Sequence, residues 1–112
     1  MTGEKEIGLR IKEIREKSRL NQTHLASYLE VDQSYISKCE KGEREFSVDL
    51  LEKISNLFGY SLSELISDDF IEKPLNIAFR SKEIHYEDLS TISEINKIAL
   101  NLKEMKKIIQ EM

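Results

Sequence analysis

Residues 7–66 contain five short segments whose apolar residues recur at helical spacing, and this pattern restricts the region to a small all-α fold. The expected helices cover residues 7–18, 22–29, 33–41, 48–58 and 62–66, with connections of a few residues. Asn21 and Asp32 are expected N-caps, and Ser61 with Glu64 forms a capping-box pattern. There is no sustained period-two alternation and no Asn-Gly turn, so strands are not expected.

Length and composition fit one compact domain, or a small domain with an appendage. The chain has 112 residues, of which 39% are hydrophobic and 34% charged, enough apolar content for a modest core. No apolar run approaches the roughly 18 residues of a membrane span, and the start MTGEKEIG lacks the apolar core of a signal peptide. The single cysteine excludes an intrachain disulfide. We therefore expect a soluble cytoplasmic protein with no membrane partner.

The charge balance argues against the simplest type of nucleic-acid binder. The chain has 17 basic and 21 acidic side chains, a net charge of −4. A basic composition is the usual electrostatic signature of DNA binding. Any DNA binding by this chain must therefore depend on a local arrangement of residues.

Residues 22–41 carry the most informative pattern, two helices joined by a short turn. Two such helices meet at a steep angle, and Ala26 provides the small side chain needed at their contact. Val31 fills the gap after the turn, and Ile36 anchors the second helix to the core. The second helix then presents Gln33, Ser34, Ser37 and Lys38 outward. These types suit a major groove, because Gln pairs with adenine and Lys reaches guanine or a phosphate.

Several further features are spaced along residues 7–66. They are Arg15, Leu20-Asn21-Gln22, Leu25-Ala26, Tyr35-Ile36-Ser37, Glu40-Lys41-Gly42, Gly59, Leu62 and Leu65. Together they resemble the phage-repressor or Cro-type regulators, also called the XRE-type helix-turn-helix family. The resemblance implies a five-helix DNA-binding domain and a sequence-specific transcriptional regulator, a repressor that binds a palindromic operator in double-stranded DNA as a homodimer. It implies no enzymatic activity and no cofactor.

The same resemblance assigns roles to individual residues. Gln22 falls on a phosphate-binding position at a helix N-terminus. The base-reading positions are Gln33, Ser34 and Lys38, and the backbone-contacting loop positions are Lys41 and Arg44. Arg15 and Glu40 fall on a structural ion pair between the first and third helices. The residues alone also allow Arg15 and Glu40 to be solvated charges, and Gln33 and Ser34 to be ordinary helix residues.

Two departures from the family pattern affect the expected DNA binding. Glu30 occupies a turn position usually held by glycine, where a positive φ costs a non-glycine residue about 1–2 kcal/mol. Glu43 and Glu45 lie in the loop after the third helix, near the expected phosphate track. Two carboxylates there should weaken non-specific binding, so we expect reliance on a dimer and a defined operator.

The C-terminal third predicts a linker and a long helix. Pro74 cannot continue a helix, and we expect residues 1–66 to be the DNA-binding domain, 67–85 a linker and 86–112 a dimerisation helix. A helix of about 26 residues would be roughly 39 Å long. The expected dimer contact is Ile92, Ile95, Ala99, Leu102, Met105 and Ile109, spaced near 3.5 residues. Alternatively, this helix packs on its own domain.

No catalytic motif and no metal-ligand spacing are present in the sequence. His24 and His85 are expected to be surface residues or caps, and Cys39 a small core residue. Two other functions are open: an antitoxin or mobile-element control protein with a toxin or anti-repressor partner, or a protein-interaction module that has lost DNA binding. Residues 77–80, followed by Glu87 and Asp88, resemble the tail of some XRE-type regulators whose genes neighbour a zinc-peptidase anti-repressor.

Overall fold

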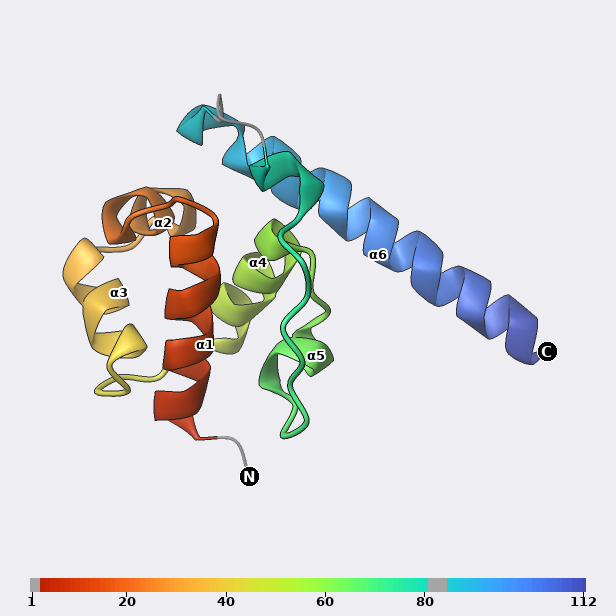
Figure 1. Ribbon diagram of the computed structural model, residues 1–112, viewed down its shortest axis with the longest axis horizontal. Coiled ribbons are helices and arrows are strands. Elements are labelled where there is room, and N and C mark those ends of the chain that lie inside the picture. The colour runs from red at the N-terminus through yellow and green to blue at the C-terminus, as the bar shows by residue number, and fades with distance from the viewer. Residues whose placement is uncertain (1–2, 81–84) are drawn as a thin grey trace.

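The computed structural model describes residues 3–80 and 85–112, so residues 81–84 of the expected linker lie outside the described residues (Figure 1). The helices are α1 (Glu4–Lys17), α2 (Gln22–Leu29), α3 (Gln33–Glu40), α4 (Val48–Phe58), α5 (Leu62–Ile66) and α6 (Leu89–Glu111), with short 3₁₀ helices η1 (Ile77–Phe79) and η2 (Tyr86–Asp88). The described residues contain no strand. The prediction of an all-α fold with a long C-terminal helix is confirmed.

Local capping interactions set several of the helix starts. The side chain of Asn21 accepts a hydrogen bond from the His24 N–H at 2.7 Å at the start of α2. At α5, the Ser61 hydroxyl accepts from the Glu64 N–H at 3.1 Å, and the Glu64 carboxylate accepts from the Ser61 N–H at 3.0 Å. This reciprocal pair is the capping box that the sequence predicts. Asp32 occupies the N-cap position of α3 without a side-chain capping bond.

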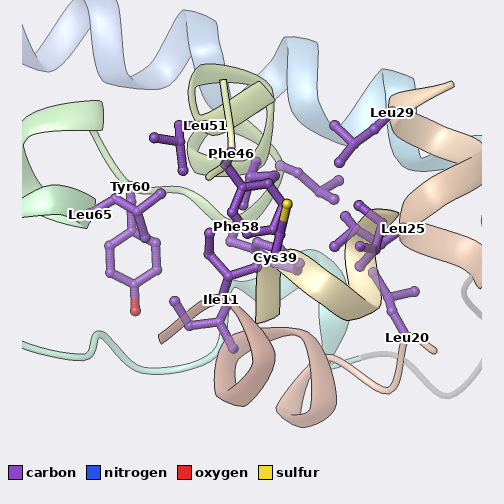
Figure 2. Close-up of a cluster of buried hydrophobic side chains, with 14 of the residues drawn as sticks. Ile11, Leu20, Leu25, Leu29, Cys39, Phe46, Leu51, Phe58, Tyr60 and Leu65 are labelled. Atoms are coloured by element: carbon purple, nitrogen blue, oxygen red, sulfur yellow. The ribbon is translucent and has the colours of Figure 1, made fainter. Parts of the chain in front are cut away.

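Helices α1 to α5 surround one hydrophobic core. Its fully buried members include Ile11, Leu25, Ile36, Cys39, Ile54, Leu57 and Leu65. Figure 2 shows side chains from different helices converging there, with the Cys39 sulfur among them, as expected for a small core residue. Gly8 lets α1 approach α3, since a Cβ at this position would overlap the carbonyl oxygen of Cys39. The close α1–α3 contact places the outer face of α3 on the domain surface.

The described part of the expected linker packs back on the domain. In η1, Phe79 is only 1% exposed, and its ring centroid lies 5.6 Å from that of Phe58 in α4. The Lys73 N–H donates to the Tyr60 hydroxyl at 2.8 Å. Residues 67–80 therefore contribute to the core instead of forming a free connection. The division into three segments remains a prediction.

Helix α6 is half packed and half free. Its first half buries Leu89 and Ser93 and packs against α4. The side-chain amide of Asn96 donates to the Leu57 carbonyl oxygen at 3.0 Å, at the end of α4. In the second half, Leu100 is half-buried and the other described side chains are exposed. Figure 1 shows this half extending away from the five-helix body.

Candidate nucleic-acid interface

The turn between α2 and α3 forms without a glycine. The Val31 N–H donates to the Ala26 carbonyl oxygen at 3.0 Å, and Ala26 is 3% exposed. Glu30 adopts the left-handed conformation, with φ 58° and ψ 42°. The turn therefore keeps the geometry that usually favours glycine, at a cost of about 1–2 kcal/mol.

The outer surface of α3 and the loop after it carry the polar side chains that the sequence predicts for DNA contact. The inner face of α3 buries Ile36, Cys39 and Glu40. On the outside, Gln33, Ser34, Lys38, Lys41 and Arg44 are exposed, whereas Ser37 and the α2 residue Gln22 are half-buried. The structure thus brings these residues together around one helix-turn-helix surface.

A buried ion pair joins α1 to α3 beneath this surface. Arg15 Nε lies 2.7 Å from Glu40 Oε2, and Arg15 Nη2 lies 2.9 Å from Glu40 Oε1. Their side chains are 8% and 1% exposed. Arg15 Nη1 also donates to the Leu20 carbonyl oxygen at 2.8 Å. This bidentate geometry fits the structural role and excludes the alternative of two solvated charges.

Two glutamine amides extend this ion pair to the surface. Gln22 Nε2 donates to Glu40 Oε1 at 2.9 Å, and Gln22 Oε1 accepts from Gln33 Nε2 at 2.6 Å. The sequence predicted a separate role for each residue and missed these bonds. Because the partners belong to different helices, no local spacing in the sequence indicates that they touch. The result is a hydrogen-bonded series that runs from Arg15 to Gln33.

Tyr35 supports the loop after α3 through contacts that sequence reasoning also missed. The Arg44 guanidinium lies over its ring, 5.2 Å from the centroid, at a distance typical of a cation–π contact. The Tyr35 hydroxyl donates to the Glu45 carbonyl oxygen at 3.0 Å, which holds the ring against the loop. Burial raises the pKa of Tyr35, so its hydroxyl stays protonated. Glu43 and Glu45 are exposed in this loop, as the electrostatic expectation requires.

The remaining candidate ligands do not form a metal site. His24 takes part in the α2 cap, where its Nδ1 accepts from the Asn21 N–H at 3.2 Å, and His85 is exposed. Within residues 3–80 and 85–112, no group of three or more His, Cys, Asp or Glu side chains is placed to hold a metal ion. No helix in those ranges combines the length and apolar character needed to cross a bilayer.

The predicted dimer stripe on α6 is divided between two faces. Ile92 packs against the core of its own domain. The other members are exposed: Ile95 61%, Leu102 61%, Met105 58%, Ile109 64%, and Ala99. Ile98, which the predicted stripe omits, is also 58% exposed. The outward apolar face therefore begins at Ile95, where the opposite side of the helix still contacts the domain through Asn96.

A five-helix fold that presents a polar α3 beside the start of α2 defines the helix-turn-helix class of DNA-binding proteins. A family model described as Helix-turn-helix matches residues 11–65. The chain belongs to the XRE-type helix-turn-helix family and is a DNA-binding transcriptional regulator. This family is not one of enzymes.

The curated relatives include control proteins and repressors. The control protein C.MunI of a Mycoplasma species is 45% identical over 67 residues, which cover 59% of this chain and 88% of that protein. The immunity repressor protein of Bacillus phage phi105 is 29% identical over 69% of this chain and 54% of its own length. The regulator ImmR of Bacillus subtilis is 30% identical over 70% of this chain and 62% of its own length. No solved structure matches the chain.

Proposed function

We propose that this regulator is a repressor that binds a palindromic operator as a homodimer, with α3 in the major groove. The observation that carries the proposal is the exposed Gln33 on α3, hydrogen-bonded to Gln22 at the start of α2. An amide held at this place can read a base edge, and a helix N-terminus beside it can bind a phosphate. The similarity to an immunity repressor supports the sign of regulation.

The polar side chains of this surface divide into base readers and phosphate binders. Gln33, Ser34, Ser37 and Lys38 lie on α3 and are assigned to base edges. Gln22, Lys41 and Arg44 lie at the start of α2 and after α3 and are assigned to the DNA backbone. The exposed Glu43 and Glu45 reduce the electrostatic attraction of this surface. A single domain should therefore bind weakly, which favours a dimer.

The second half of α6 supports a second copy as the dimer partner. Leu100 faces the domain, and Ile98 and Leu102 lie two residues away on either side, which is about 160–200° around the helix axis. The domain therefore cannot cover the outward face. An exposed apolar helix face is unfavourable in water unless it has a partner. A two-fold axis along this face would place two α3 helices in successive major grooves, about 34 Å apart.

The deciding experiment is selection of bound duplexes from a random DNA library, followed by sedimentation of the protein with and without the selected site. A palindromic site bound by two chains is the expected result. Recovery of an asymmetric site bound by one chain would contradict the dimer. Failure to enrich any sequence would favour a protein-interaction module that has lost DNA binding.

The second candidate is a control protein with the same DNA mechanism. Identities of 45% with C.MunI and 37% with C.BamHI of Bacillus amyloliquefaciens favour it. A reporter gene placed downstream of the selected site separates the two functions. A repressor lowers reporter expression at every protein concentration, and any other response favours the control protein. A toxin or anti-repressor partner remains a prediction from the sequence.

A further inference from the structure

We propose that Glu40 is a positioning residue for base recognition, because it fixes the orientation of the Gln22 and Gln33 amides. This inference rests on the proposed function of Gln33 as a base reader. It goes beyond the ion-pair role of Glu40, since it assigns to this buried carboxylate an effect on which base is preferred. The argument starts from which atoms can donate and which can only accept.

An ionised carboxylate has no hydrogen to donate, so Glu40 can only accept hydrogen bonds. Arg15 occupies both of its oxygens, at 2.7 Å and 2.9 Å. The amide of Gln22 contacts Oε1 of the same carboxylate at 2.9 Å. Its NH₂ group must face Glu40, because a carbonyl oxygen there would be repelled. The carbonyl oxygen of Gln22 is therefore turned toward α3.

The orientation of Gln22 then determines that of Gln33. The Gln22 carbonyl oxygen is an acceptor, so Gln33 must present its NH₂ group to it, as it does at 2.6 Å. One Gln33 N–H is used in this bond. The second N–H and the Gln33 carbonyl oxygen have no partner among the described residues. Gln33 is exposed, so both groups are available to a ligand.

A free N–H beside a free carbonyl oxygen matches the major-groove edge of adenine, which offers N7 as an acceptor and the N6 amino group as a donor. Without a fixed NH₂ direction at Gln22, the Gln33 amide could rotate and offer the reverse order. Glu40 removes this freedom before DNA arrives. Preorganisation of this kind raises selectivity because the correct orientation is not ordered on binding.

The test is Glu40→Gln, which keeps the size of the side chain but can donate as well as accept. We expect the preference of the full chain for adenine at the position read by Gln33 to fall from about 5- to 150-fold to about threefold or less. The matched control is Ile54→Val in the core of α4, which costs stability without touching this network. Both variants are measured well below their melting temperatures. A purely structural role of Glu40 would leave the base preference unchanged, and that result would overturn the proposal.

A second variant covers the case in which Glu40→Gln does not fold. Gln22→Met leaves the buried ion pair intact and removes the link to Gln33. It should lower the base preference in the same way, and an unchanged preference would contradict the inference. In the free protein, the NMR chemical shifts of the Gln22 and Gln33 side-chain NH₂ groups should both change in Glu40→Gln. Unchanged chemical shifts would also contradict the inference.

Gln33→Ala on the same duplexes separates this inference from the proposed function. If Gln33→Ala leaves the base preference unchanged, the base-reading role itself is wrong. If Gln33→Ala removes the preference but Glu40→Gln and Gln22→Met do not, the positioning role of Glu40 alone is wrong.

Discussion

The imidazole ring of His24 stacks on the phenol ring of Tyr86, with centroids 3.4 Å apart and planes 16° from parallel. His24 lies in the first turn of α2, and Tyr86 lies in η2, directly before α6. The contact therefore joins the segment directly before α6, the proposed dimerisation helix, to α2, which forms part of the DNA-binding surface. The same imidazole accepts the Asn21 N–H through Nδ1, which requires the neutral ring.

This contact predicts a dependence of stability on pH. Burial lowers the pKa of His24 below its ordinary value of 6.5, so the unfolded chain binds the proton more readily. The stabilisation is therefore fully present above pH 6.5 and is lost as the pH falls through the lower pKa of the folded state. The melting temperature of the wild type should fall as the pH is lowered from 7.5 to about 5.5. In His24→Gln, which keeps a side chain able to form a capping box, the fall should be smaller. Equal falls would contradict the role of His24.

The ion pair between Arg15 and Glu40 predicts a large loss of stability when either partner is removed. Arg15→Met or Glu40→Leu should lower the free energy of unfolding by about 3–5 kcal/mol, because each leaves a buried charge unpaired. The double variant should lose less than the sum of the two. Urea unfolding measures all three. Lys17→Met, which breaks an exposed pair with Glu72, is the control and should have little effect.

The left-handed Glu30 predicts a stabilising substitution. Glu30→Gly should raise the free energy of unfolding by up to about 1 kcal/mol, since relief of about 1–2 kcal/mol of strain exceeds the extra entropy of glycine in the unfolded chain. Ser27→Gly, at an exposed helical position of α2, should instead lower it by about 0.5 kcal/mol. If both variants lose stability equally in thermal unfolding, the turn carries no strain.

The assignment of base readers and phosphate binders predicts two types of binding defect. Gln33→Ala should weaken the selected site by about 1–3 kcal/mol and relax the preference at one base pair. Lys41→Ala should weaken selected and scrambled duplexes similarly and reduce the slope of log K against log salt by about 1. Titrations at several salt concentrations test both. A salt slope unchanged in Lys41→Ala would remove that residue from the backbone contacts.

The outward face of α6 predicts a dimer that two substitutions abolish. Leu102→Glu with Met105→Glu should give a folded monomer whose operator affinity falls by about 10²-fold or more, because the second domain no longer binds as part of the same molecule. Lys103→Gln with Lys107→Gln changes the net charge equally on the side of α6 that lines a cleft with α4 and α5. Sedimentation should show this control as a dimer. A dimeric Leu102→Glu, Met105→Glu variant would place the contact elsewhere.

Truncation gives a second test of the same interface, and the structure determines where to cut. A chain ended after Phe70 would lose Phe79 and Leu89, which are both 1% exposed and belong to the core. A chain ended after Leu100 keeps these residues and the Asn96 hydrogen bond to α4. We expect this fragment to fold as a monomer, and a dimer would contradict the proposed interface.

The helices and the helix-turn-helix could be predicted from sequence because their causes are local. Capping at Asn21 and Ser61, and apolar spacing within each helix, act over a few residues. Ala26 and Ile36 identify the inner sides of α2 and α3 for the same reason. Periodicity also predicted α6, but it could not tell which apolar residues face the domain. Ile92 packs on the core and Ile98 does not, although both have suitable spacing.

The sequence by itself thus determined the helices, their order and the family of this protein. Tertiary structure alone decided what these helices bring together. Phe79 becomes part of the core because residues 67–80 pack back across α4. The start of α2 lies beside α3, so Gln22 contacts both Glu40 on the inner face of α3 and Gln33 at its start. These three side chains therefore form one hydrogen-bonded series. Such contacts depend on the relative placement of separate helices, which local periodicity does not encode.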